Sequence, residues 1–374
     1  MIFALFALAA TVTWNFDGGS ADKVEPVSER HFRVYAHGQT DQDGRNRQAS
    51  WYYFRVDNVR SGVEYTFDMV GLPGEYNYQP NKGAITKDTV PVFSTDQVNW
   101  RYIPPTHVDY DAAEARLRFR VTVPNSDHFW VAHVPPYTNA NLERLRKLVK
   151  REEVIGKSVE GRPLYLWTIE GGANPKATVW LMFRQHAWEA GSSWVGDGAV
   201  RDLLKDARGI RWKILPFADP DGVAHGGVRF NRNGFDLNRN WDVVDPVKMP
   251  EITAQRNAIA SWLKAGNKVD LFFSLHNTET GEYLEAQSLE HKELAQRFFG
   301  ALQKTTFAPT RPLFFGTEST TAGKPGRMNV IQGLWRDYKI PGFLMEQKIA
   351  SKPTVDQRTQ FGQLLVSAIA GLFR

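Results

Sequence analysis

The part of the chain that follows Glu153 alternates between two patterns, and this alternation restricts its fold more than any other feature. Short continuous apolar runs, typical of strands buried on both faces, are separated by stretches with helical periodicity. This order predicts an α/β domain whose sheet is covered by helices on both faces. The strand candidates are 165–169, 177–183, 212–217, 269–275 and 342–345, and the helix candidates are roughly 192–205, 250–264, 289–303 and 354–373.

Residues 12–137 follow a different pattern, which predicts an all-β domain. The segment 115–124 alternates between apolar and polar residues, as a half-buried strand does. Further runs at 51–56, 65–70 and 128–134 are rich in aromatic and β-branched residues, and turn-forming segments separate them. Short strands at this spacing are typical of a sandwich, which would serve as a scaffold or line the rim of a substrate site.

A short helix is expected between the two domains. Thr138 or Asn139 can cap it, and it would occupy the linker 138–152 with its leucines on one face. Residues 153–374 then form the second domain.

The apolar residues 1–11 admit two interpretations. Residues 7–9 resemble a signal-peptidase site, although the stretch is short and lacks a basic start. The alternative is a first strand that continues into residues 11–14. A shortened export signal is favoured, and with it an exported or periplasmic location over a cytoplasmic one. No other run is long and apolar enough to span a membrane, so stable membrane insertion is not expected.

The composition limits the metal ligands, nucleophiles and partners that the chain can have. The chain has 374 residues and no cysteine, which excludes disulfides, thiolate metal sites and a cysteine nucleophile. Histidine, aspartate and glutamate remain as the strong metal ligands. The 46 Lys and Arg residues barely exceed the 41 Asp and Glu residues, so a nucleic-acid partner is not expected.

Polar side chains follow three of the predicted strands. His186 and Glu189 are three residues apart, a spacing that places both on one face of a helical turn. His276 and Glu346 each follow another apolar run. Ligands of α/β sheets bind beyond the carboxyl ends of the strands, so the four side chains are expected to meet there. One of them alone would be interpreted as an ordinary loop residue, but the four together indicate a metal site.

The segment 219–241 is a loop rich in arginine, asparagine and glycine. Its guanidinium groups, on Arg229 and Arg239, can bind carboxylates through paired hydrogen bonds, and Asn238 adds a neutral donor. A solvated or nucleic-acid-contacting loop is the alternative. Beside a metal centre, a role in binding an anion is the better explanation.

Together these motifs resemble the zinc metallocarboxypeptidases, or funnelins, over residues 153–374. The domain ahead of them is similar to the N-terminal domain of the cytosolic carboxypeptidases, mainly at 51–56 and 129–138. The resemblance implies a carboxypeptidase-like fold with a mixed, mostly parallel sheet. The matching segments are 186–189 (His-Ala-Trp-Glu), 219–222 (Asp-Pro-Asp-Gly), 236–241 (Asp-Leu-Asn-Arg-Asn-Trp), 274–276 (Ser-Leu-His) and 343–346 (Phe-Leu-Met-Glu).

The resemblance implies hydrolysis of the C-terminal peptide bond of a peptide or peptidic stem, with release of one amino acid. His186, Glu189 and His276 would hold one Zn²⁺ and leave a fourth position for water. Glu346 would act as the general base that takes the proton of the water and passes it to the leaving amine.

The same resemblance assigns the loop residues. Arg229 would stabilise the oxyanion of the tetrahedral intermediate. Asn238 and Arg239 would bind the terminal carboxylate of the substrate, and Asp236 would orient a zinc-bound histidine.

The chain departs from the family at three places. Trp188 stands where pancreatic-type members carry arginine, and 317–324 contains no tyrosine that could close over the substrate. The segment 320–327 is stretched relative to the compact Ser-Thr-Ala-Arg of cytosolic-type members. Arg327 or Lys324 could line the specificity pocket and favour an acidic terminal residue, or the segment could be a solvated loop.

Two other functions remain open. A zinc amidohydrolase that deacylates N-acyl amino acids would use similar motifs, although the large β-domain argues against it. An inactive peptidase-like binding protein would need neither Glu346 nor Arg229. The sequence leaves open the preferred terminal residue, the oligomeric state and any regulation.

Overall fold

The computed structural model describes residues 9–279, 281–316, 326–349 and 353–374, and the chain divides into two compact units. Of the described residues, unit 1 contains 9–40 and 44–136, and unit 2 contains the others. The first eight residues, on which the interpretation as an export signal depends, lie outside the described chain. Among the described residues, no helix is both long and apolar enough to cross a membrane.

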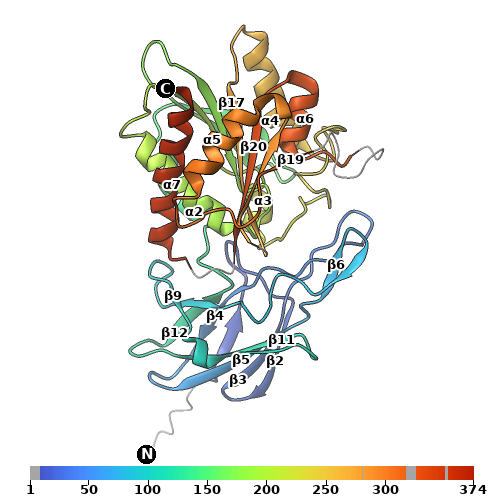
Figure 1. The fold of residues 1–374 in the computed structure, drawn as a ribbon. Helices are drawn as coiled ribbons and strands as arrows, with labels where there is room; N and C mark the ends of the chain where they lie inside the picture. Colours follow the sequence, from blue (N-terminus) through green and yellow to red (C-terminus); the bar gives the residue numbers. More distant parts are fainter. Residues whose placement is uncertain (1–8, 280, 317–325, 350–352) are drawn as a thin grey trace, which may run out of the picture. The chain divides into compact units, whose positions relative to one another are not determined.

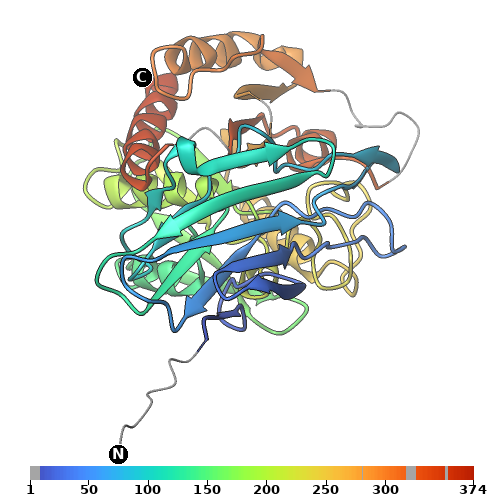
Figure 2. The same ribbon diagram turned by 90° about the horizontal axis from the view of Figure 1, so that it is seen from below.

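Unit 1 is built from two five-stranded sheets around a shared aromatic core. Figure 2 shows its strands as the blue to teal arrows. Phe54 of the first sheet and Phe67 of the second lie with their ring centroids 5.5 Å apart. The expected β-rich N-terminal domain is confirmed. In the first sheet the strand order is β1 (Thr11–Thr13), β4 (Tyr53–Asp57), β12 (His128–Ala132), β8 (Val92–Ser94), β9 (Arg101–Tyr102). In the second sheet the order is β10 (Val108–Asp111), β11 (Arg116–Thr122), β5 (Glu64–Val70), β3 (His31–Tyr35), β2 (Lys23–Ser28). A hairpin of β6 (Gly74–Tyr76) and β7 (Gln79–Asn81) and a short 3₁₀ helix, η1 (Pro105–His107), complete the unit.

The centre of unit 2 is a mixed eight-stranded sheet (Figure 1). Its four middle strands run parallel, and antiparallel strands flank them on both sides. This arrangement confirms the expected mixed α/β fold. The strand order is β13 (Glu152–Lys157), β14 (Pro163–Ile169), β16 (Arg211–Leu215), β15 (Thr178–Phe183), β17 (Leu271–Thr278), β20 (Gly342–Lys348), β18 (Tyr283–Gln287), β19 (Phe314–Gly316).

Helices cover both faces of this sheet (Figure 1). On one face Phe273 of β17 packs against Phe298, on the side of α2 (Ala190–Leu203), α5 (Lys292–Leu302) and α7 (Val355–Ala370). On the other face Phe272 and Leu344 share a core with Ile252 and Ile331 of α4 (Pro250–Lys264) and α6 (Val330–Tyr338). The remaining elements are α1 (Asn139–Arg146), α3 (Pro220–Ala224), η2 (Leu289–His291) and η3 (Gly371–Phe373).

Two strand ends differ from the prediction in a way that matters for the site. β17 continues to Thr278 and β20 continues to Lys348, so His276 and Glu346 lie inside strands rather than after them. The ladder between the two strands is formed by backbone groups, which pair whether the side chains are apolar or polar. A pattern of apolar residues therefore ends before the strand does.

Candidate metal centre

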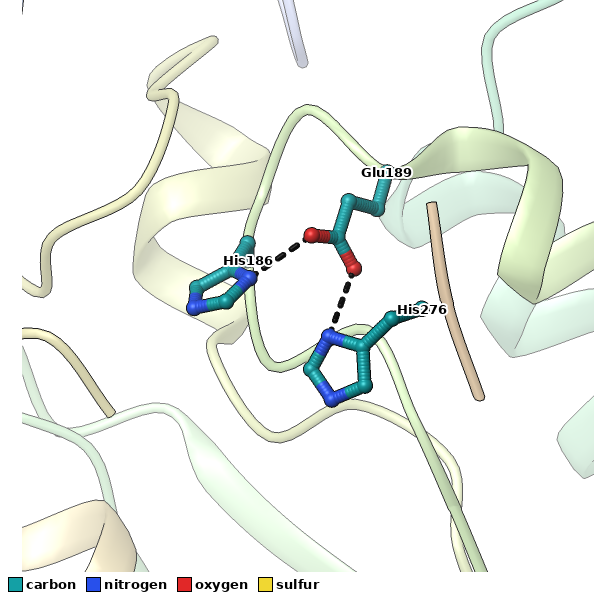
Figure 3. Close-up of side chains that lie close together, drawn as sticks. All are labelled: His186, Glu189 and His276. Carbon is teal, nitrogen blue, oxygen red and sulfur yellow. Dashed lines mark hydrogen bonds and ion pairs between the residues drawn. The ribbon is translucent and has the colours of Figure 1, made fainter. Parts of the chain in front are cut away.

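His186, Glu189 and His276 form a buried cluster in unit 2. Each offers one ligand atom, and these atoms lie within 4.8 Å of one another. Figure 3 shows the carboxylate of Glu189 between the two imidazole rings. Its Oε1 lies 2.7 Å from Nδ1 of His186, and its Oε2 lies 3.0 Å from Nδ1 of His276. The three predicted ligands are therefore brought together as a possible metal site.

A sharp turn after β15 brings His186 and Glu189 into this cluster. Arg184 has φ +64°, a left-handed conformation that is costly for a residue other than glycine. Its buried guanidinium secures the turn: Nε donates to the carbonyl of Ala187 at 2.8 Å, and Nη1 donates to Oγ of Ser193 at 3.0 Å. Glu189 is the residue that immediately precedes α2, so this helix positions its side chain.

His276 and Glu346 are neighbours across the ladder between β17 and β20. Residues paired in this way present their side chains on the same face of the sheet, so Glu346 lies beside the metal cluster. Among the described residues, Oε2 of Glu346 is buried and has no hydrogen-bond partner. Burial and the negative charge of Glu189 raise the pKa of Glu346 above its ordinary value.

The charges of the cluster are strongly coupled. Burial alone would lower the pKa of His186, but Glu189 and Asp236 outweigh burial and raise it to about 9. The two histidines lower the pKa of Glu189 in spite of its burial. Burial lowers the pKa of His276. In the protein without zinc, one protonated histidine thus balances Glu189, and metal binding would displace that proton.

Asp236 connects the cluster to the arginine-rich loop. Its Oδ1 lies 3.1 Å from Nε2 of His186, on the side of the ring away from Glu189, and its Oδ2 accepts from Nε of Arg229 at 2.7 Å. Both positive neighbours hold the pKa of Asp236 well below its usual range, against the effect of burial. This contact is the one expected of a carboxylate that orients a metal-binding histidine.

Asn238 and Arg239 lie next along the same loop. Oδ1 of Asn238 accepts from the backbone N–H of Val330 at 2.9 Å, and Nη1 of Arg239 donates to the carbonyl of Asn238 at 2.8 Å. Arg327, in the segment before α6, is half-buried. Its predicted contact with substrate stays a prediction, and Lys324 and the rest of 317–325 lie outside the described residues.

The donor set fits zinc. Two imidazole nitrogens and one carboxylate are common ligands of catalytic zinc, and all three residues here are at most 3% exposed. Oε2 of Glu346, which has no partner within the described part of the chain, gives a second indication, because a buried carboxylate oxygen normally has one. A water molecule or substrate atom at a metal centre would provide one.

Two residues beside the metal cluster were not predicted from the sequence. Oε1 of Gln185 and Oγ of Ser274 each lie 3.0 Å from Nε2 of His276, the ring nitrogen that faces away from Glu189. Both could have been suggested by position, because Gln185 precedes His186 and Ser274 is two residues from His276 on the same strand face.

Comparison with known proteins agrees with this geometry. The zinc carboxypeptidase family matches residues 140–284, and the cytosolic carboxypeptidase N-terminal domain matches residues 12–133. An uncharacterised protein of Zymomonas mobilis is 26% identical over 355 residues, which cover 88% of this chain and 86% of that protein. Cytosolic carboxypeptidase 6 of Mus musculus is 28% identical over 314 residues. That match covers 75% of this chain, but the chain spans only 56% of the length of the mouse protein.

The fold has a counterpart among solved structures. The crystal structure of a metallo-carboxypeptidase from Burkholderia cenocepacia matches with a TM-score of 0.81 and 21% identity, over 98% of this chain and 99% of that chain. At this identity the likeness concerns the fold alone. The family matches cover the β-rich N-terminal domain and the segment that contains all three candidate ligands. The chain therefore combines a zinc carboxypeptidase domain with a cytosolic carboxypeptidase N-terminal domain.

Proposed function

We propose that this protein is a zinc-dependent carboxypeptidase that hydrolyses the last peptide bond of a peptide or peptidic stem and releases one amino acid. One observation carries the proposal: three zinc-type ligands converge beside a glutamate whose Oε2 is buried without a partner among the described residues. A metal site alone would not require such a carboxylate, but hydrolysis requires a base next to the metal.

Zinc held by His186, Glu189 and His276 would polarise the scissile carbonyl and lower the pKa of a water molecule. Glu346 takes the proton from that water and gives it to the leaving amine. In the zinc-free protein, burial and repulsion from Glu189 favour protonated Glu346. The charge of a metal ion held by the cluster would offset this repulsion, and Glu346 would then be available as a base near neutral pH.

Arg229 supplies a fixed positive charge to the developing oxyanion. Its side chain is 12% exposed and is held by the ion pair with Asp236. It also acts on His186, whose pKa it lowers, so its charge reaches the metal cluster. Loss of one oxyanion-stabilising donor typically costs roughly 10²–10³ in rate.

Asn238 and Arg239 bind the terminal carboxylate of the substrate and so restrict cleavage to the last residue. Arginine suits this role because its planar guanidinium matches a carboxylate with two hydrogen bonds. The nearby bond from Val330 to Asn238 keeps the loop fixed to the start of α6. Arg327 remains a candidate contact for the substrate in this proposal.

The test is to incubate zinc-loaded protein with a mixed peptide pool and identify the products by mass spectrometry, with and without a chelator. Release of single C-terminal residues, abolished by the chelator, is expected. Amidation of the terminal carboxylate should suppress release, and N-acyl amino acids should be poor substrates. Rapid deacylation of those compounds with intact peptides would favour the amidohydrolase instead.

Two variants separate catalysis from binding. Glu346→Gln should retain about one zinc per chain, and its turnover should fall by roughly 10²–10⁴-fold or more. Glu290→Gln, which alters an exposed glutamate of η2, is the matched control and should behave as the parent protein. Full activity in Glu346→Gln would contradict the assignment of the base.

A further inference from the structure

The sheet face that carries the metal cluster continues as a row of polar side chains on β18. Tyr283 of β18 pairs with Glu346, which in turn pairs with His276. Because alternate residues of a strand point to one face, Glu285 and Gln287 lie on the same face as His276 and Glu346. Glu285 is two residues, or roughly 7 Å, along the strand from the level of Glu346.

Glu285 and Gln287 are buried hydrogen-bond acceptors that converge. They are 7% and 4% exposed, and among the described residues Oε1 of Gln287 has no hydrogen-bond partner. The position that a Cβ atom on Gly316 would occupy lies 2.3 Å from Oε1 of Glu285 and 3.0 Å from Oε1 of Gln287. The two oxygens therefore approach one point, and glycine at 316 allows them that space.

This pair is connected to the residues proposed to bind the terminal carboxylate. Nδ2 of Asn329 donates to Oε1 of Glu285 at 3.1 Å, and the next residue, Val330, donates to Oδ1 of Asn238 at 2.9 Å. Arg239 lies close enough to lower the pKa of Glu285. A substrate held by Asn238 and Arg239 would thus have its terminal side chain near Glu285.

We propose that Glu285 and Gln287 receive the side chain of the terminal residue and select a cationic one, lysine or arginine. This inference rests on the proposed carboxypeptidase function. An ammonium or guanidinium group carries only donors, which match the carboxylate of Glu285 and the amide oxygen of Gln287, whose Oε1 has no partner among the described residues. The terminal carboxylate of the same residue neutralises Arg239, so both charges of the substrate find partners.

The electrostatic state of Glu285 agrees with this choice. Burial raises the pKa of Glu285, while Asn329 and Arg239 act to lower it. A cation beside the carboxyl group would favour its ionised form, whereas an apolar side chain would leave a buried carboxyl group against hydrocarbon. An acidic side chain would meet two acceptors and be repelled. If Arg327 instead selected an acidic terminal residue, the order of preferred substrates would be the opposite.

The experiment compares zinc-loaded protein on four peptides that are identical except for a final Lys, Arg, Leu or Glu. For the parent protein, kcat/KM should be highest for Lys and Arg, about tenfold or more above Leu, and lowest for Glu. Glu285→Gln should reduce the ratio of Lys to Leu by about tenfold or more, mainly through KM. Gln287→Leu should reduce the same ratio and provides a second test if Glu285→Gln folds poorly. Glu290→Gln, on the surface, is the control for loss of one negative charge.

Binding is measured separately from turnover. In a Glu346→Gln background, calorimetry should show tighter binding of the Lys peptide than of the Leu peptide, and Glu285→Gln should remove the difference. A parent protein that prefers Leu or Glu, or variants that leave the order unchanged, would overturn the inference while the carboxypeptidase function stands. If no peptide is hydrolysed although the Lys peptide binds more tightly, the proposed function fails and the inference about Glu285 and Gln287 survives.

Discussion

At the scale of single residues, the carboxyl group of Asp219 shows how burial near the metal centre affects stability. Its Oδ1 accepts from the backbone N–H of Gly222 at 2.9 Å, which caps α3. Its Oδ2 is buried and has no partner among the described residues. Burial, followed by the nearby Glu251, raises the pKa of Asp219 to about 8. The group is therefore mostly protonated at neutral pH in the folded, zinc-free protein.

This pKa predicts a pH-dependent stability. The folded pKa of about 8 lies above the ordinary value of 3.8, so the folded protein binds the extra proton between these pH values. Its contribution to stability is therefore present at low pH and is lost as pH rises through this window. In Asp219→Asn, the free energy of unfolding should fall less steeply with rising pH, by up to about 1.4 kcal/mol per pH unit. The variant should therefore be more stable than its parent near pH 8.

Urea unfolding of zinc-free protein at several pH values between 5 and 8 measures this effect. The difference between the variant and its parent isolates Asp219 from other titrating groups. Asp43→Asn, at an exposed position, should reproduce the parent curve. Parallel curves for Asp219→Asn and the parent would contradict the raised pKa.

At the scale of secondary structure, the packing of α2 on α7 fixes the start of α2, and Glu189 is the residue just before it. The two helices approach closely because each has glycine at the contact. A Cβ on Gly198 would lie 2.1 Å from the carbonyl oxygen of Thr359, and one on Gly362 would lie 2.1 Å from that of Val195. Backbone atoms cannot move aside as a flexible side chain can.

Gly198→Ala should therefore separate the helices, lower the free energy of unfolding by about 1–3 kcal/mol and weaken zinc binding through Glu189. Thermal unfolding and competition with a chelator measure the two effects. Gly300→Ala on α5 is the matched control, because nothing lies within 4 Å of its added Cβ. It should be stabilising by about 0.5–1 kcal/mol. Gly198→Ala as stable as its parent would rule out the close helix contact.

At the scale of the whole molecule, all three candidate zinc ligands belong to unit 2. Zinc that binds only the folded state stabilises it by about 2.7 kcal/mol at a hundredfold excess over Kd. Hydrogen exchange should therefore slow in β15, β17 and β20 when zinc is added to protein depleted by a chelator. Strands β5 and β11 of unit 1 should exchange at unchanged rates. Equal protection in both units would mean that they unfold together.

The sequence by itself predicted the class of fold and the three residues of the possible metal site. Continuous apolar runs predicted β14, β15, β16, β17 and β20, because strands buried on both faces must be apolar throughout. His186 and Glu189 were recognisable because their spacing is local to one turn. By contrast, β18, β19 and α6 were not predicted. Tyr283–Gln287 mixes apolar and polar residues over only five positions, which is too few for a period to stand out.

Only the tertiary structure decided which distant residues share a face with the zinc ligands. His276 and Glu346 meet through strand register, and the row from Tyr283 to Gln287 joins them through the antiparallel pairing of β18 with β20. A shift of one residue in that pairing would turn Glu285 and Gln287 to the opposite face. The register is set by the packing of the whole sheet against its helices, and no short segment encodes it. For this reason the sequence indicates the reaction, whereas the expected choice of terminal side chain depends on the folded sheet.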